Sequence, residues 1–241
     1  MSHDFLFYIE RDGVVSGDLR LDGDEHHHLA RVVRMRPGDT AFVTDGAGTI
    51  LECEITEVAR EYSRLRAVRT LERPAPVRPP VLALGCIKRE RFERAVAYGT
   101  ELGMERCIPV LSRNGARTQY NDRFLERLRT IALAAMKQSF RAVLPRIDPP
   151  IRVEELVEQC GGFDTVIVGS QEAPALVLPP AAGRVMVIVG PEAGFTAEEQ
   201  QALAGAGAIA ASVSSARLRS ETAAIAMLSL VNSPAPAGQS D

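Results

Sequence analysis

The sequence predicts an α/β protein in which a small β-rich module precedes a mainly parallel sheet with helices on both faces. Short alternating apolar runs fill the first 71 residues, a proline-rich stretch then interrupts every periodicity, and strand and helix patterns alternate from Val81 onward. We therefore expect an N-terminal domain at 1–71, a linker at 72–80, a second domain at 81–232 and a disordered tail at 233–241.

The elements follow from local patterns. In the N-terminal module, we expect strands at 5–9, 40–44, 50–58 and 62–71, with a turn at 45–48. In the second domain, strands are predicted at 81–84, 107–111, 165–169, 185–189 and 209–213. Helices are predicted at 89–102, 122–139, from 197 onward, and at 221–231.

Composition narrows the class of protein. The formal net charge of −3 argues against a wholly basic nucleic-acid binder, so local basic patches decide that question. No apolar run is long enough to cross a bilayer, and the first residues lack the features of a signal peptide, so we expect a cytoplasmic protein without a membrane partner. The four cysteines are dispersed, which favours buried free thiols over a metal cluster.

The most informative stretch runs from Val185 to Glu199. A β-branched apolar run stops at Gly190-Pro191-Glu192, and a helix begins after Thr196, which has capping-box spacing to Glu199. Loops at the carboxyl ends of parallel strands are where α/β sheets bind ligands, because backbone N–H groups there remain available. This joint is therefore a candidate ligand site, with an ordinary strand-to-helix turn as the alternative.

A basic patch lies at 26–39. Leu29, Val32, Val33 and Arg36 stand at helical spacings, which predicts that the apolar positions face inward and that His28, Arg31 and Arg34 form an outward cationic stripe suited to phosphates. Adjacent histidines point in different directions on a helix and have no carboxylate or cysteine partner at ligand spacing, so we expect no metal site. A dimerisation module with a solvated charged face is the alternative interpretation.

A second polar constellation lies at 214–224. Two arginines, Arg217 and Arg219, precede the last helix, where Ser220 can act as the cap. Cations beside a helix start and close to the Gly-Pro-Glu loop favour a pocket for an anionic or adenosine-type ligand. The GxGxxA match at 205–210 follows a helix and precedes a strand, so we interpret it as a helix-ending turn and not as a dinucleotide fingerprint.

Taken together, these motifs resemble the knotted SPOUT RNA methyltransferases, and in particular the bacterial RsmE-type branch. The resemblance rests on Gly190-Pro191-Glu192-x-Gly194-Phe195, on Leu218-Arg219-x-Glu221-Thr222-Ala223, and on the early run from His27 to Asp39. It implies an N-terminal PUA-like barrel and a C-terminal knotted α/β domain. It also implies a homodimer that uses S-adenosylmethionine to methylate N3 of a uridine in small-subunit (16S) ribosomal RNA, with the RNA already in the assembled small subunit.

The resemblance also implies roles for residues. The implied cofactor-binding residues are Gly169, Val189, Gly190, Pro191, Glu192, Gly194, Arg217, Leu218, Thr222 and Ala223. The implied RNA-binding residues are His27, His28, Arg31, Arg34, Lys88, Arg89, Arg91, Arg113 and Arg141. The predicted catalytic residues are Arg219, which would stabilise negative charge on a uracil oxygen, and Glu221. Glu192 is an alternative base, and either carboxylate can instead orient Arg219.

The chain departs from the family pattern at several polar positions. Ala193 replaces a glycine, Gly99 replaces a lysine, Ala134 and Lys137 replace acidic residues, and Ala216 replaces an arginine. Arg217 and Arg113 stand beside the changed positions and can compensate. A knotted RNA-binding protein with impaired or redirected catalysis therefore remains the alternative function.

Overall fold

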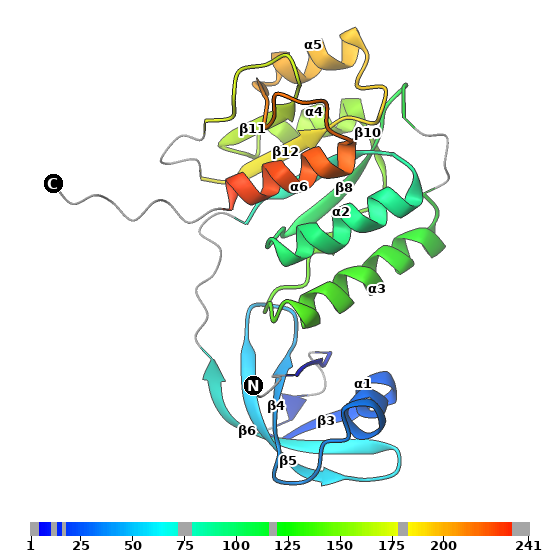
Figure 1. Ribbon diagram of the computed structural model, residues 1–241, viewed down its shortest axis with the longest axis vertical. Helices are drawn as coiled ribbons and strands as arrows, with labels where there is room; N and C mark the ends of the chain where they lie inside the picture. Colours follow the sequence, from blue (N-terminus) through cyan, green and yellow to red (C-terminus); the bar gives the residue numbers. More distant parts are fainter. Residues whose placement is uncertain are drawn as a thin grey trace, which may run out of the picture. The chain divides into compact units, whose positions relative to one another are not determined.

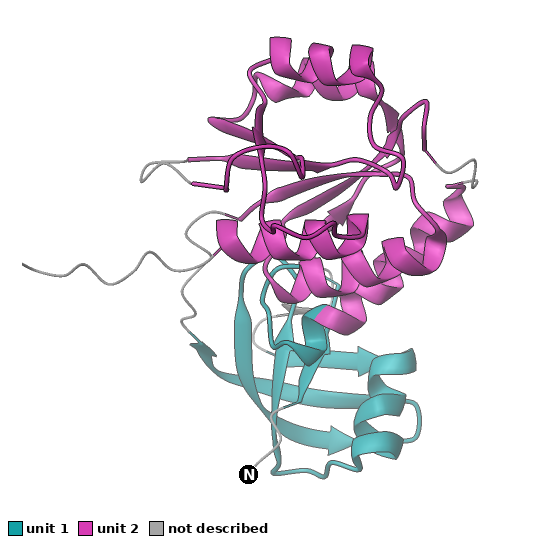
Figure 2. Ribbon diagram, turned by 45° about the horizontal axis from the view of Figure 1, so that its top comes forward, with its two compact units in different colours: residues 1–75, 136–144 teal, residues 76–135, 145–241 magenta. Residues whose placement is uncertain are grey.

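A computed structural model describes residues 5–10, 14–15, 18–71, 79–115, 120–177 and 183–232. The chain divides into two compact units, each of which is described by itself: unit 1 holds residues 1–75 and 136–144, and unit 2 holds residues 76–135 and 145–241 (Figure 2). Most of the predicted linker at 72–80 and the whole predicted tail at 233–241 lie outside the described residues. The predicted domain boundaries therefore stay predictions.

Unit 1 is built on a six-stranded sheet with the order β1-β4-β5-β6-β3-β2, which Figure 1 shows strongly curled. Its neighbours pair antiparallel, except β1 and β4, which run parallel. The predicted β-rich module is confirmed, although β2 and β3 were not predicted. The strands are β1 (Leu6–Tyr8), β2 (Val14–Val15), β3 (Asp18–Asp22), β4 (Thr40–Thr44), β5 (Ile50–Val58) and β6 (Tyr62–Leu71).

The helical segment of unit 1 differs from the predicted amphipathic helix. A short α1 (Gly23–His27) continues into a π-helix, η2 (His28–Val33), and ends at Arg34 in the left-handed conformation with φ 62°. Leu29 is buried as expected, but Val32 is 62% exposed, so its predicted inward position was wrong. A π-helix has more residues per turn than an α-helix, and this turns Val32 away from the core.

His26, in the same segment, is also buried in unit 1. Its Nδ1 lies 2.8 Å from the Ser63 hydroxyl, and its Nε2 lies 3.3 Å from the carbonyl oxygen of Arg60. A buried ring with polar partners on both nitrogens is a satisfied structural histidine. His26 therefore ties α1 to β6.

Residues 136–144 belong to unit 1 although they are far from its strands in sequence. Ala47 forms an isolated antiparallel bridge with Val143, and the Gly48 N–H donates to the Ala142 carbonyl at 2.9 Å. Lys137 forms an ion pair with Glu25. The contacts of Ala142 and Val143 close the β4–β5 turn, and that of Lys137 reaches α1, from a segment that the sequence pattern did not assign to this unit.

Unit 2 contains a parallel sheet with the order β10-β8-β7-β12-β11-β13, and β9 pairs with β8 off this path. Every pairing described in it is parallel, which confirms the predicted sheet type. The central strands β7 and β12 are buried along their whole length, as expected of apolar runs covered on both faces. The strands are β7 (Val81–Gly85), β8 (Arg106–Leu111), β9 (Arg146–Ile147), β10 (Ile151–Arg152), β11 (Thr165–Gly169), β12 (Val185–Val189) and β13 (Ile209–Ala211).

Helices cover both faces of this sheet (Figure 1). One face packs on α4 and α5, where Val81, Ala83, Met186 and Ile188 share a core with Leu156 and Leu203. The opposite face carries α6, which packs on β7, β12 and α2. The helices are α2 (Arg89–Glu101), α3 (Asp122–Gln138), α4 (Val153–Cys160), α5 (Ala197–Gly205) and α6 (Ser220–Val231). Of these, α4 was not predicted, nor were β9 and β10.

Candidate active site

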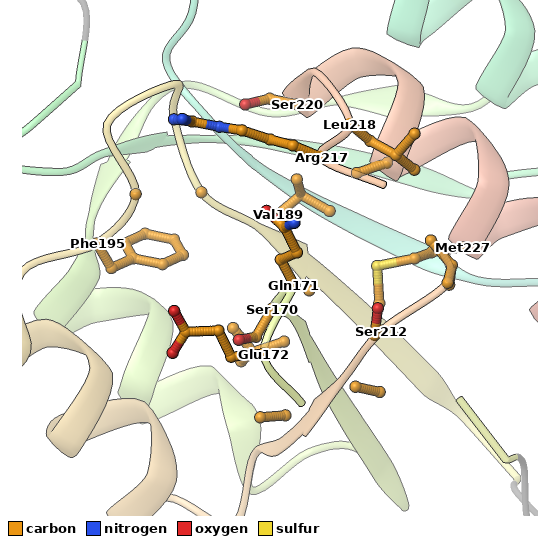
Figure 3. A pocket seen from close by; sticks show the side chains of 18 of the residues that line it. Ser170, Gln171, Glu172, Val189, Phe195, Ser212, Arg217, Leu218, Ser220 and Met227 are labelled. Carbon is orange, nitrogen blue, oxygen red and sulfur yellow. The ribbon is translucent and has the colours of Figure 1, made fainter. Parts of the chain in front are cut away.

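A pocket of about 880 Å³ lies in unit 2 where β11, β12 and β13 end. Its size falls within the usual range for small-molecule sites, and its place at the carboxyl ends of parallel strands is where α/β sheets bind ligands. In Figure 3, Phe195 and Glu172 lie to one side of the pocket and Leu218 and Met227 to the other. It is lined by residues 168–172, 189–195, 210–214 and 216–220, together with Gln200, Leu203, Ala204, Ala208, Ala223 and Met227.

The loop after β12 forms one wall of the pocket. Gly194 has φ +73°, a conformation that L side chains rarely adopt, and its N–H donates to the Pro191 carbonyl at 2.8 Å. The turn places Phe195, which is 6% exposed, against the pocket. The predicted capping box is confirmed, because Glu199 N–H donates to the Thr196 hydroxyl at 3.2 Å and Thr196 N–H donates to Glu199 Oε2 at 2.8 Å.

This wall approaches the sheet closely at Gly85, the last residue of β7. A Cβ atom at Gly85 would lie 2.5 Å from both N and Cδ of Pro191. Real Cβ contacts essentially never occur below 3.0 Å, so only glycine accommodates the loop at this distance. The sequence analysis did not identify Gly85 as part of the site.

The loop after β13 forms a second wall and leads into α6. Arg217, Leu218 and Arg219 all line the pocket, and both arginines are exposed. Arg219 is the N-cap residue of α6 and makes no side-chain cap hydrogen bond. Ser220 is the first residue of the helix and is buried at the pocket, so the cap predicted for Ser220 was wrong.

Arg91 connects the two walls. Its Nη1 donates to Glu192 Oε1 at 2.9 Å, and its Nε lies 3.8 Å from Glu221 Oε1. The side chain of Glu221 is 6% exposed. Its Oε2 is buried and has no hydrogen-bond partner within the described ranges. Arg91 is therefore the cation that faces this buried carboxylate, and it holds the starts of α2 and α6 to the loop after β12.

Most of the predicted cofactor-binding residues line the pocket, but two of the predicted site residues do not. The predicted residues that line it are Gly169, Val189, Gly190, Pro191, Glu192, Gly194, Arg217, Leu218, Arg219 and Ala223. Glu221 and Thr222 are not among its lining residues, since Glu221 is buried beside Arg91 and Thr222 is exposed on α6. Ser170, Gln171 and Glu172 also line the pocket but were not predicted, although their position directly after a predicted strand was a usable signal.

The predicted RNA-binding residues of unit 1 differ in exposure. His27, Arg31 and Arg34 are exposed on α1, η2 and the turn that follows. His28 is half-buried, with its ring 5.8 Å from the Phe7 ring in an edge-on arrangement. Arg141 is also half-buried, and burial lowers the pKa of its guanidinium group. Of the outward stripe predicted from His28, Arg31 and Arg34, the two arginines are exposed and His28 is not, and the RNA-binding role of these residues stays a prediction.

The predicted RNA-binding residues of unit 2 gather at the start of α2 and at the end of β8. Lys88, Arg89 and Arg113 are exposed, and the Arg89 guanidinium lies 4.9 Å from the centre of the Phe124 ring. Arg91 differs from them because it is half-buried and paired with Glu192. Three of these four cations are thus open to solvent at the surface of unit 2.

The structure also explains several departures from the family pattern. Ala193 lies outside the left-handed region, so its side chain does not strain the cofactor loop. Gly99 is buried on α2, and a Cβ atom there would meet Met104 and Leu228 at 3.2–3.3 Å, so this position packs inside unit 2. Lys137 is accommodated by its ion pair with Glu25. Nothing in the structure explains the replacement at Ala134.

Cys53, Cys86, Cys107 and Cys160 are free and buried, as predicted. Within the described ranges, no group of three or more His, Cys, Asp or Glu side chains is arranged to hold a metal ion. None of the described helices is both long and apolar enough to span a bilayer.

Comparison with known proteins bears on both units. Residues 73–232 match the RNA methyltransferase domain family, and residues 21–67 match the RNA methyltransferase PUA domain family. A curated ribosomal RNA small subunit methyltransferase E from Mycobacterium bovis is 35% identical over 242 residues, which cover 94% of this chain and 90% of that protein.

Solved structures agree with this assignment. A probable rRNA-methyltransferase from Porphyromonas gingivalis is 26% identical, with a TM-score of 0.82 over 94% of this chain and 96% of that one. A ribosomal RNA small subunit methyltransferase E from Neisseria gonorrhoeae, solved bound to S-adenosyl methionine, has the same fold, with 24% identity and a TM-score of 0.87 over 95% of this chain and 96% of that one. The predicted fold class, a SPOUT-type knotted α/β domain with an N-terminal PUA-like barrel, is confirmed. The chain belongs to the ribosomal RNA small subunit methyltransferase E family.

Proposed function

We propose that this protein transfers the methyl group of S-adenosylmethionine to N3 of a uridine in small-subunit ribosomal RNA. The observation that carries the proposal is the pocket formed by three strand-end loops, with Arg219 in its lining, in a chain that matches the RNA methyltransferase family over residues 73–232. We further propose that the protein acts in the cytoplasm as a homodimer, on RNA within the assembled small subunit.

The lining of the pocket suits S-adenosylmethionine chemically. Val189, Leu218 and Met227 offer apolar surface for the adenine ring, while loop backbone groups suit its polar edge. The donor carries a carboxylate together with cationic ammonium and sulfonium groups. Arg217 complements the carboxylate, and the carboxylates of Glu172 and Glu192 complement the cations. The bound donor supplies an electrophilic methyl group.

On the acceptor side, uridine N3 becomes a nucleophile only when it loses its proton, and the negative charge then spreads onto the two uracil oxygens. We assign Arg219 to this charge, because its side chain lines the pocket at the start of α6. A fixed cation that faces the developing anion lowers the barrier without reorganising at the moment of reaction. The pocket also aligns N3 with the methyl group.

The two candidate carboxylates receive positioning roles. Glu192 is ion-paired with Arg91, and Glu221 is buried beside the same guanidinium and outside the pocket lining. We therefore infer that Glu192 and Glu221 orient the pocket walls and that the N3 proton passes to solvent.

RNA recognition is assigned to the cationic groups of both units. His27, His28, Arg31 and Arg34 in unit 1, with Lys88, Arg89, Arg113 and Arg141, contact phosphates, and their charges supply affinity that weakens with salt. Folded RNA is recognised largely through its shape and its unstacked bases, so these contacts position the strand and the pocket selects the base. Arg91, paired within unit 2, serves the pocket instead.

The proposal is tested by methyl transfer. The purified protein is incubated with S-adenosylmethionine labelled in the methyl group and with small ribosomal subunits, large subunits or transfer RNA, and the label in RNA is counted. We expect label in the small-subunit RNA alone, and none with Arg219→Ala. Binding of subunits without any transfer by the wild-type protein would instead indicate a non-catalytic relative.

A further inference from the structure

The carboxylate of Glu199 joins two loops that lie far apart in sequence. The residue is 6% exposed, on the first turn of α5. Its Oε2 accepts from the Ser112 hydroxyl at 2.9 Å and from Thr196 N–H at 2.8 Å. Its Oε1 accepts from Arg113 N–H at 2.9 Å. Capping α5 needs only the contact with Thr196, so the two bonds to the loop after β8 are additional to the helix cap.

One side of this junction is the pocket wall. Thr196 follows Phe195, which lines the pocket, and the Phe195 carbonyl also accepts from Gln200 Nε2 at 3.0 Å. The peptide group that joins Phe195 to Thr196 is therefore held to the first turn of α5 at both its carbonyl and its N–H. If Phe195 shifts when a ligand binds in the pocket, Thr196 shifts with it, and Thr196 is bonded directly to Glu199.

The other side of the junction is the loop of residues 112–115, which carries Arg113. The pKa of Glu198 is lowered by a hydrogen bond from its own backbone N–H, by one from the Thr196 hydroxyl, and by the charge of Arg113. The Arg113 side chain is exposed, and the bond from its backbone N–H to Glu199 places the residue at the start of α5. The Asn114 N–H donates to the Ser112 hydroxyl at 3.3 Å, so the turn itself is built on the side chain that Glu199 holds.

A buried carboxylate makes this junction stiff. Removing donors from a buried charge leaves it unsatisfied, which costs far more than separating two neutral partners in water. Charge-assisted hydrogen bonds are also roughly twice as strong as neutral ones. The two loops are therefore expected to keep their contact and to shift as one body.

We propose that Glu199 is a positioning residue that links the methyl-donor pocket to the RNA-contacting loop of residues 112–115, so that donor binding and RNA binding favour each other. The inference rests on the proposed function in that Arg113 contacts RNA. Coupling of this kind is reciprocal, so that each ligand strengthens the binding of the other by the same factor.

The experiment measures the affinity for small ribosomal subunits with and without saturating S-adenosylhomocysteine, the demethylated product of the donor. The ratio of the two dissociation constants is the coupling factor. Three variants are compared with the wild-type protein: Ser112→Ala, Arg113→Ala and the double variant. Thr196→Ala is the control, since it removes the α5 cap hydroxyl but leaves all three bonds to the Glu199 carboxylate.

We expect a coupling factor of about fivefold or more in the wild-type protein. In Ser112→Ala the coupling factor falls close to one, while binding of S-adenosylhomocysteine to the free enzyme is unchanged. In a protein that already carries Arg113→Ala, adding Ser112→Ala does not lower the coupling factor further. Thr196→Ala lowers the thermal midpoint but keeps the coupling.

Three results would overturn the inference. The first is a coupling factor of one in the wild-type protein, and the second is a coupling factor in Ser112→Ala equal to that of the wild type. The third is a double variant in which the two substitutions reduce the coupling factor independently, so that their effects multiply. Failure of the proposed function is distinguishable, because the wild-type protein would then transfer no methyl group whatever the coupling ratios are.

Discussion

Arg91 and Glu192 form an ion pair across 101 residues of sequence, with Nη1 2.9 Å from Oε1. The same guanidinium faces Glu221, a buried carboxylate at the start of α6. One side chain on α2 thus fixes two of the three loops that build the pocket. This relationship makes the cofactor pocket depend on a residue whose sequence context, Lys88-Arg89-x-Arg91, is that of an RNA-binding cluster.

Arg91→Ala is expected to weaken binding of S-adenosylhomocysteine about tenfold, since losing a half-buried ion pair costs roughly 1–2 kcal/mol. Calorimetry on the free enzyme measures this. Adding Glu221→Gln is expected to restore part of the lost thermal stability, because a neutral amide at this buried position needs no cation.

Arg89→Ala, on the same helix, is the matched control. Its exposed cation should contribute about one unit to the slope of log affinity for small subunits against log salt, whereas Arg91→Ala should leave that slope unchanged. If Arg91→Ala lowers the slope by one unit and leaves cofactor binding intact, Arg91 is a phosphate contact and the positioning role is wrong.

Gly85→Ala should disrupt the pocket from behind. The new Cβ atom would lie 2.5 Å from the backbone nitrogen of Pro191, so the loop after β12 must move. We expect S-adenosylhomocysteine binding to weaken at least about tenfold, as for overpacking that costs roughly 1–3 kcal/mol. Gly205→Ala is the control, because its Cβ atom meets nothing within 4 Å and alanine favours the helix. Normal affinity in the Gly85→Ala protein would contradict the close approach.

Arg217→Ala and Arg219→Ala should separate binding from chemistry. Loss of the charge that stabilises the uracil anion is expected to lower kcat by about 100-fold or more, while the affinity of Arg219→Ala for S-adenosylhomocysteine stays close to that of the wild type. Arg217→Ala should instead weaken that affinity about tenfold, by loss of a charge-assisted contact. Steady-state kinetics and calorimetry on both variants measure this, and equal losses of kcat and affinity in Arg219→Ala would refute its role.

The buried thiols predict a pH dependence of stability. Burial raises the pKa of Cys86 to about 12 from 9.0, and burial together with the charge of Glu52 raises that of Cys53 to about 12. The pKa of the thiol is higher in the folded state than in the unfolded state. The buried, protonated thiol therefore contributes its full stabilisation below about pH 9, and this stabilisation is lost as the pH rises toward 12. Urea unfolding across that range should show a shallower decline for Cys86→Ala than for the wild type. Parallel declines would contradict the raised pKa.

Much of unit 2 was predictable because its signals are local. The run from Val185 to Val189 is β-branched and ends at glycine, and Thr196 and Glu199 cap the next helix within one turn. The strand of residues 165–169 was found in the same way. The residues that follow this strand line the pocket, and the rule that ligands bind beyond strand ends would have predicted them.

The rest could not be read from local patterns. The exposure of Val32 depends on a π-helical turn, and a pattern of six residues does not distinguish such a turn from an α-helix. Glu199 was recognisable as a capping residue, but its bonds to Ser112 and Arg113 span 87 and 86 residues. Residues 136–144 join unit 1 through backbone contacts that leave no trace in composition.

The central claim is methylation of uridine N3 in small-subunit RNA, and identification of the modified nucleoside tests it most directly. Small subunits from a strain that lacks the modification are treated with the protein and labelled S-adenosylmethionine, and the RNA is digested and analysed by mass spectrometry. The account predicts labelled 3-methyluridine as the product, absent with Arg219→Ala. No labelled nucleoside, or a label on a different base or on ribose, would contradict it.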